Sequence, residues 1–183
     1  MKVEKTPLPG VLLITPKVFG DARGFFMESF NARAFEAATG VTDRFVQDNH
    51  SLSARHVLRG LHYQLPPMAQ GKLVRVTAGE IFDVAVDVRQ SSPTFRQWFG
   101  CRLSADNFRQ LWIPAGFAHG FLAMTENTQV QYKTTHYYAP DHERSLFWAD
   151  ESLGIDWPDT GGDKAVSAKD AQAPRLNKAE LFK

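Results

Sequence analysis

The sequence predicts an all-β sandwich or barrel, and the spacing of its apolar residues is the main reason. Short segments with alternating apolar and polar residues recur along the chain, separated at close intervals by turns rich in Gly, Pro, Asn and Asp. Only one segment, early in the chain, has the pattern of a credible helix. The length of 183 residues, without an internal repeat or a linker, fits a single domain spanning residues 1–183.

The strands can be assigned in chain order from this alternation. They are predicted at residues 11–15, 25–30, 45–53, 57–64, 72–77, 80–88, 98–103, 109–113, 117–122, 129–135 and 145–148. The Ala78-Gly79 step between two of these strands predicts a hairpin. A chain with this many strands has to protect its sheet edges, and closure into a barrel or dimerisation would do so.

The remaining segments are predicted to be a helix, a turn and a tail. Asn31 can cap a helix over residues 32–39, and Gly40 can end it. Residues 19–24 have the composition of a turn, which precedes the strand at 25–30. From residue 150 onward the chain reads as an irregular C-terminal tail, with one helical turn at 169–172.

Charge and composition exclude several classes of protein. The chain has 21 Lys and Arg against 20 Asp and Glu, so it has no basic surface for nucleic acid. No apolar run approaches the length of a membrane span, and the first ten residues lack the apolar core of a signal peptide. Cys101 is the only cysteine, so no internal disulfide is possible. These features predict a cytoplasmic protein with no nucleic-acid or membrane partner.

Five polar side chains, spread over several predicted strands, would converge inside a barrel: Arg59, His62, Lys72, His119 and Tyr132. A histidine is the usual proton carrier in catalysis, and Arg and Lys suit an anionic substrate. Arg59 and His62 are three residues apart, so a regular strand would place them on opposite faces. Gly60 between them can mark a β-bulge that redirects one of the two side chains.

A metal site is the alternative use of such histidines. Small barrels often bind metal through two histidines separated by one residue, but Gln64 stands two positions after His62. His119 is a second possible ligand, yet no Asp or Glu lies at a convenient spacing beside either histidine. Two scattered histidines do not supply the three protein ligands of a typical site. We therefore expect no metal.

Several segments resemble, in order and at compatible spacing, the motifs of the dTDP-4-dehydrorhamnose 3,5-epimerase family. The segments are RGFFMESF, QDNHS, LRGLHYQ, QGKLVRV, PAGFAHGF, QYKTTHYYAPDHER and SAKDA, and together they cover nearly the whole chain. The resemblance implies a cupin-type jelly-roll barrel that forms a homodimer and uses neither metal nor organic cofactor.

The resemblance also implies roles for individual residues. It matches His62 to the catalytic base, Asp170 to the carboxylate paired with that base, and Tyr132 to the proton donor. Lys72 matches a residue at the oxygen of the sugar, and Tyr138 matches an aromatic that stacks on the thymine. The other matched substrate-binding positions are Arg23, Glu28, Gln47, Asn49, Arg59, His119 and Glu143.

The implied substrate is a dTDP-linked 4-keto-6-deoxyhexose, dTDP-4-dehydro-6-deoxy-D-glucose, inverted at C3 and C5. The C4 carbonyl acidifies the hydrogens on both neighbouring carbons, which suits a histidine base, a cation for the developing oxyanion and a tyrosine acid. Two alternatives stay open at this point. The protein could invert only one carbon of a related nucleotide sugar, or it could be a barrel that binds a sugar nucleotide without catalysis.

Overall fold

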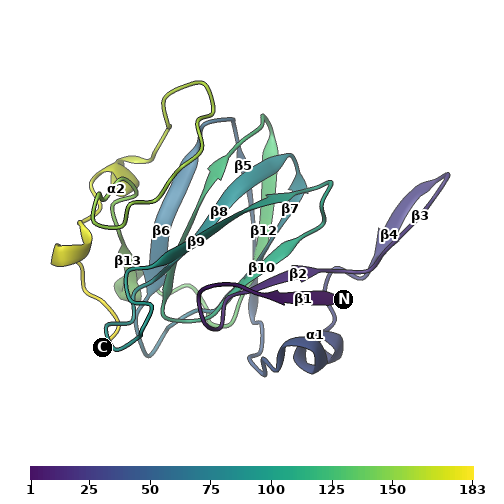
Figure 1. Cartoon of the computed structure of the whole chain (residues 1–183), viewed down its shortest axis with the longest axis horizontal. Helices are drawn as coiled ribbons and strands as arrows, with labels where there is room; N and C mark the ends of the chain where they lie inside the picture. Colours follow the sequence, from purple (N-terminus) through teal and green to yellow (C-terminus); the bar gives the residue numbers. More distant parts are fainter.

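Two antiparallel β-sheets face each other in the computed structural model, which describes residues 1–183 (Figure 1). The six-stranded sheet has the order β1 (Lys2–Lys5), β2 (Leu12–Thr15), β10 (Gln110–Ile113), β7 (Lys72–Ala78), β12 (Thr128–Thr134) and β5 (Gln47–Ser53). The five-stranded sheet has the order β13 (Glu143–Ser145), β6 (Leu58–Gln64), β11 (Phe117–Ala123), β8 (Glu80–Asp87) and β9 (Trp98–Ser104). The predicted all-β jelly roll is confirmed.

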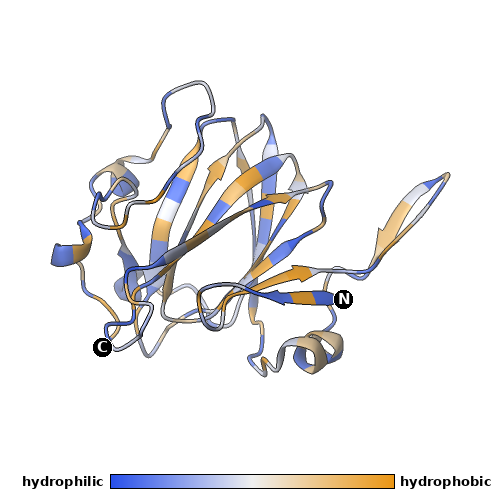
Figure 2. Cartoon of the chain, in the orientation of Figure 1, coloured by the Kyte–Doolittle hydropathy of each residue, from blue (hydrophilic) through white to orange (hydrophobic).

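The main core lies between the two sheets. Val74 and Val130 of the six-stranded sheet pack in one apolar cluster with Ile81 and Phe121 of the five-stranded sheet. Hydrophobic and hydrophilic residues alternate along many of the strands (Figure 2), which follows from side chains pointing to opposite faces in turn. The cluster occupies one part of the space between the sheets and leaves the rest for polar side chains.

The outer face of the six-stranded sheet is partly covered by α1 (Ala32–Thr39), which forms as predicted. The Asn31 side chain accepts a hydrogen bond from the Ala34 amide at 3.0 Å, and Gly40 ends the helix in a left-handed conformation. Phe35 of the helix packs edge-on against Trp112 of the sheet. Neither helix of the structure has the length and apolar character needed to cross a membrane.

The outer face of the five-stranded sheet is covered by the tail, residues 150–183. It contains η2 (Leu176–Lys178) and α2 (Ala168–Ala171), which begins one residue before the predicted helical turn, and the short helix η1 (Pro140–His142) precedes β13. Leu153 and Leu176 are buried against the sheet with Tyr63 and Val84. The tail therefore packs as part of the domain although it has little regular structure, and it brings α2 beside β6 (Figure 1).

The predicted hairpin at Ala78-Gly79 is wrong. β7 pairs with β10 and β12, whereas β8 pairs with β9 and β11, so the chain crosses from one sheet to the other at Gly79. Gly79 has φ +74°, and a Cβ there would lie 2.4 Å from the Thr125 hydroxyl oxygen. The glycine permits a sharp corner between sheets rather than a turn within one.

The sequence analysis did not predict a hairpin that lies near the N-terminus. β3 (Val18–Asp21) and β4 (Gly24–Met27) pair with each other and project away from both sheets (Figure 1). The predicted strand at 25–30 ends at Met27, so Glu28 lies just after the strand rather than on it. β1 was also missed, and the predicted strand at 145–148 lies instead at Glu143–Ser145.

Candidate active site

A β-bulge on β6 directs both Arg59 and His62 toward the space between the sheets. His62 pairs with His119 and Arg59 pairs with Phe121, so two residues on β6 between these pairs oppose one on β11. Gly60 has φ +125°, and a Cβ there would lie 2.5 Å from the Cα of Gly120. The bulge predicted from the sequence is therefore present, and only glycine fits in it.

A cavity of about 480 Å³ lies between the sheets. Six of the predicted residues line it: Arg59, His62, Lys72, His119, Tyr132 and Asp170. A smaller depression of about 120 Å³ adjoins it, since His62, Lys72 and Tyr132 border both, and it adds Gln47, Asn49, Tyr138 and Glu143. The fold thus brings together the predicted catalytic residues and most of the predicted binding residues.

His62 and Asp170 form a hydrogen-bonded pair within this cavity. The distance from His62 Nε2 to Asp170 Oδ1 is 2.6 Å, and the Asp170 side chain is only 4% exposed. Asp170 lies on α2, where the Ser167 hydroxyl caps the helix by accepting from the Asp170 amide at 3.1 Å. Because the carboxylate accepts from Nε2, the lone pair of His62 is on Nδ1, where it can take a proton.

The charge of Asp170 is maintained by its partners. Burial opposes its ionisation, but hydrogen bonds from His62 and from the Gly60 amide outweigh that effect and hold the pKa of Asp170 below its usual range. An ionised carboxylate fixes the tautomer of a histidine and stabilises its protonated form. The geometry therefore suits His62 as a general base.

Lys72 places a positive charge beside this pair. Its ammonium group donates a hydrogen bond to the backbone oxygen of His62 at 3.2 Å, and the residue is buried on the inward face of β7 with Val74 and Val76. Burial lowers the pKa of Lys72 from 10.5 to about 8, although the charges of Asp83 and Glu143 act in the opposite direction. A cation held at a buried position in the cavity is well placed to stabilise an oxyanion.

Replacing Lys72 with methionine should therefore lower kcat/KM by about 100-fold while making the folded protein more stable. The fall of the Lys72 pKa from 10.5 to about 8 corresponds to roughly 3 kcal/mol of destabilisation when the amine is charged, and methionine removes that cost. Lys133→Met is the control, since Lys133 pairs with Asp48 on the other face of the same sheet. Denaturant melts and kinetics on both variants would check this, and a Lys72→Met protein with full activity or lower stability would contradict it.

The lowered pKa of Lys72 also predicts how the stability and the activity of the protein change with pH. Folded protein loses the Lys72 proton near pH 8 and unfolded protein near pH 10.5, so the unfolded state binds more protons between these values. The contribution of Lys72 to stability should therefore rise across that interval, while kcat/KM should fall as the oxyanion loses its cation.

Tyr132 approaches the cavity from the sheet opposite His62. It lies on β12, between Val74 of β7 and Asn49 of β5 in the register. Burial raises the pKa of the Tyr132 phenol, so the group holds its proton at neutral pH. An acid on the six-stranded sheet and a base on the five-stranded sheet can act on opposite faces of a molecule bound between them.

His119 has a carboxylate partner that the sequence analysis missed. His119 Nε2 lies 2.7 Å from Asp83 Oδ1, and both side chains are buried. Burial lowers the pKa of His119, against the opposing effect of Asp83. The sequence did contain an indication of this pair. Asp83 shares the inward face of β8 with Ile81 and Ala85, and an unpaired charge is unfavourable there.

The mouth of the site combines an aromatic with charged groups. The Tyr138 hydroxyl donates to Glu143 Oε2 at 3.0 Å, and the ammonium group of Lys169 pairs with the same carboxylate oxygen. Lys169 lines the cavity next to Asp170 but was not among the predicted residues. Its place in the irregular tail gave no periodic signal, and its position beside Asp170 was the only available indication.

Arg23 and Glu28 lie apart from this site within one chain. Arg23 is at the tip of the projecting β3–β4 hairpin, where its side chain is 90% exposed and pairs with Asp21. Glu28 follows the hairpin and is also exposed, and neither residue lines the cavity or the adjoining depression. Their roles in substrate binding therefore stay predictions, and within one chain neither residue borders the cavity.

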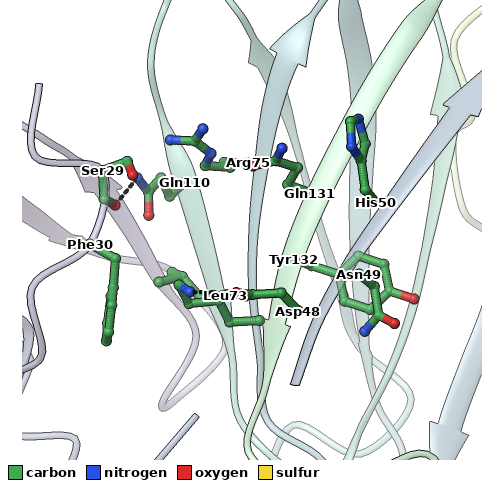
Figure 3. A pocket seen from close by; sticks show the side chains of 11 residues that line it. Ser29, Phe30, Asp48, Asn49, His50, Leu73, Arg75, Gln110, Gln131 and Tyr132 are labelled. Carbon is green, nitrogen blue, oxygen red and sulfur yellow. Dashed lines mark hydrogen bonds and ion pairs between the residues drawn. The ribbon is translucent and has the colours of Figure 1, made fainter. Parts of the chain in front are cut away.

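A different depression of about 250 Å³ is shown in Figure 3. It is bordered by polar residues such as Arg75, Gln110 and Gln131, and the Gln110 side chain donates to the backbone oxygen of Ser29 at 2.8 Å. It contains no histidine paired with a carboxylate and no inward-facing lysine. The cavity with His62 is therefore the candidate active site.

The donor groups of the structure do not form a metal site. No three His, Cys, Asp or Glu side chains come together in a set that could hold a metal ion. At the position where a metal-binding barrel often has its second histidine, Gln64 is buried and hydrogen-bonded to backbone groups. Its side-chain amide forms hydrogen bonds with the protein backbone rather than facing the cavity as a free ligand.

Comparison with known proteins agrees with this geometry. The family model described as dTDP-4-dehydrorhamnose 3,5-epimerase matches residues 5–178. The chain belongs to the dTDP-4-dehydrorhamnose 3,5-epimerase family. A member of this name from Pseudomonas aeruginosa is 58% identical over 182 residues, which cover 100% of this chain and 99% of the relative.

Solved structures give the same assignment. The family enzyme from Legionella pneumophila in complex with dTDP-4-keto-L-rhamnose superposes with a TM-score of 0.96 at 51% identity, covering 100% of this chain and 97% of that one. A 3′-monoepimerase from Streptomyces bikiniensis in complex with dTDP-quinovose has a TM-score of 0.88 at 34% identity, covering 94% and 88%. The fold is thus shared by a relative named as a 3,5-epimerase and by one named as a 3′-monoepimerase.

Proposed function

We propose that the protein is an isomerase that inverts C3 and C5 of dTDP-4-dehydro-6-deoxy-D-glucose to give dTDP-4-dehydro-L-rhamnose. The observation that carries this proposal is the His62–Asp170 pair on one side of a cavity and Tyr132 on the other, with Lys72 beside them. The ligand of the Legionella relative, dTDP-4-keto-L-rhamnose, supports the same substrate class.

The residues account for the reaction step by step. His62 Nδ1 takes the proton from C3 or C5, and the electron pair of the broken C–H bond moves toward the C4 oxygen. Lys72 stabilises that oxyanion, and Asp170 stabilises the protonated His62. The Tyr132 hydroxyl then gives its proton to the opposite face of the same carbon. His62 returns its extra proton to solvent and Tyr132 regains one, so the sum is an isomerisation without redox change.

The nucleotide is assigned to the mouth of the cavity. Tyr138 is exposed beside the adjoining depression, where its ring can stack on the thymine. Arg59 borders the cavity, where its guanidinium suits the diphosphate. Its hydrogen bonds to the Ser53 hydroxyl and the Leu52 backbone oxygen fix its direction.

A monoepimerase is the alternative, and the Streptomyces relative is the observation in its favour. Purified protein incubated with the ketosugar nucleotide should give the L-rhamno product, identified by NMR of the sugar ring. A product inverted at one carbon would favour the alternative, and no conversion would overturn the proposal. The same incubation after exhaustive chelation should proceed at an unchanged rate, since we expect no metal.

We further propose that the protein is a homodimer in which each chain completes the site of the other. The β3–β4 hairpin exposes Phe19, Phe25 and Phe26, the last at 70%, and a free two-stranded hairpin is only marginally stable in water. Packing against a second copy would bury these rings and could bring Arg23 and Glu28 to the cavity of that copy. The proposed cytoplasmic location rests on the lone Cys101 and the nucleotide-sugar substrate.

Complementation between two inactive variants tests this arrangement. Arg23→Ala and His62→Ala should each be impaired, but a mixed dimer would pair the intact His62 of one chain with the intact Arg23 of the other. Random mixing makes half of the dimers mixed with one good site each, so about a quarter of the wild-type activity should return. Mixed protein no more active than its parents would show that Arg23 does not act across the dimer.

A further inference from the structure

The segment 136–139 carries Tyr138 to the mouth of the site without regular secondary structure. Three glutamine side chains bond to its backbone. Gln70 donates to the His136 oxygen at 2.7 Å, Gln47 accepts from the Tyr138 amide at 3.0 Å, and Gln64 bonds at two points. The position of Tyr138 therefore depends on side chains rather than on a strand ladder.

Gln64 makes the most extensive of these contacts. Its amide oxygen accepts from the Ala139 amide at 2.9 Å, and its amide nitrogen donates to the Tyr137 oxygen at 3.2 Å and to the Met68 oxygen at 2.6 Å. Both N–H donors of the primary amide are thus used, together with its acceptor. At 3% exposed, the side chain has little access to water that could replace these bonds.

Gln64 also connects this segment to the catalytic strand. It lies two residues after His62 on β6, at the strand's end, and directly opposite Glu143 in the register with β13. The Glu143 carboxylate in turn accepts from the Tyr138 hydroxyl. One buried amide therefore links the strand of the base to the residues on either side of Tyr138.

We propose that Gln64 is a positioning residue that holds segment 136–139 so that Tyr138 is presented to the nucleobase. This inference rests on the proposed function, because it takes Tyr138 as the residue that stacks on the nucleobase. A side chain here must donate to two carbonyls and accept from one amide. Methionine has the length but none of the hydrogen bonds, and glutamate places a negative charge against two carbonyl oxygens.

The test measures the affinity for dTDP by calorimetry and the kinetics with the ketosugar nucleotide. Gln64→Met should weaken dTDP binding about tenfold and raise KM similarly, while kcat at saturation stays within about threefold. Tyr63→Phe is the matched control, because Tyr63 directly precedes Gln64 on β6, is equally buried, and loses one bond to the Glu180 backbone oxygen. Its affinity for dTDP should stay within about twofold of the wild type.

A double-mutant cycle shows whether Gln64 affects the affinity for dTDP through Tyr138. If Gln64 acts through Tyr138, Gln64→Met should change the dTDP affinity by less than about twofold in a Tyr138→Ala background. Equal weakening in both backgrounds, or a drop in kcat with unchanged affinity, would overturn the inference. Because the cycle is scored on affinity alone, a wild type that binds dTDP but converts no ketosugar would overturn only the proposed function. A wild type that does not bind dTDP would overturn both.

Gln64→Glu provides a second variant should the methionine protein fail to fold. A protonated glutamic acid can both donate and accept, so the dTDP affinity of Gln64→Glu, relative to wild type at each pH, should recover as the pH is lowered. A ratio that stays constant with pH would contradict the assigned hydrogen bonds.

Discussion

Replacing His62 with alanine should reduce epimerisation by at least about 1,000-fold and should stop hydrogen exchange with solvent at both C3 and C5. The reason is that His62, with its side chain 30% exposed, has its Nε2 bonded to Asp170 and its Nδ1 left to take a proton, whereas His119, the other histidine that lines the cavity, is buried against Asp83. Binding of dTDP should change little, because the groups assigned to the nucleotide lie on other side chains. Exchange would be followed by NMR in deuterated water.

The control for this variant is His50→Ala. His50 is exposed and bonds to Gln129 rather than to a carboxylate, so its loss should leave exchange and turnover within about twofold of the wild type. Residual exchange near the wild-type rate in His62→Ala would remove His62 from the role of base. Loss of dTDP binding together with exchange would point to a damaged fold instead.

Replacing Tyr132 with phenylalanine should separate exchange from inversion. His62 can still remove a proton and return it, or a deuteron from solvent, to the same face, so exchange should remain within about tenfold of the wild type. Inversion needs a proton on the opposite face and should fall by about 1,000-fold. The phenyl ring keeps the packing of Tyr132 on β12, so the melting temperature should change by only a few degrees.

A purely structural tyrosine at position 132 gives a different pattern. In that case exchange and inversion would fall together in a protein of lower melting temperature. Full inversion in a stable Tyr132→Phe variant would exclude Tyr132 as the acid. Tyr63→Phe, a buried tyrosine on the tail side of β6, serves here as the control for loss of a hydroxyl alone.

Features set by local sequence were predictable. The cap at Asn31 and the stop at Gly40 depend on nearby backbone geometry, and both ends of α1 agree with the structure. The inward direction predicted for Lys72 is correct, because side chains two apart on a strand share a face and Val74 and Val76 are buried on the same face. Gly60 correctly indicated the bulge that directs Arg59 and His62 to one cavity.

Features that depend on long-range register were not predictable in the same way. Two strands flanking Gly79 can pair or pass into opposite sheets, and the choice depends on β10 and β12, which are distant in sequence. The pairing of Asp83 with His119 and of Lys169 with Glu143 likewise exists only after the strands and the tail have packed. Within one chain Arg23 does not border the cavity. The surface that would cover its hairpin belongs to the second copy that we propose.

The most direct test of the account is a single conversion of the ketosugar nucleotide by wild-type protein in deuterated water, with the deuterium at each ring carbon measured by NMR. A base and an acid on opposite faces of one cavity should leave one solvent deuterium at C3 and one at C5 of the inverted product. Inverted product without deuterium at these carbons, or with deuterium at only one of them, would contradict the proposed double epimerisation.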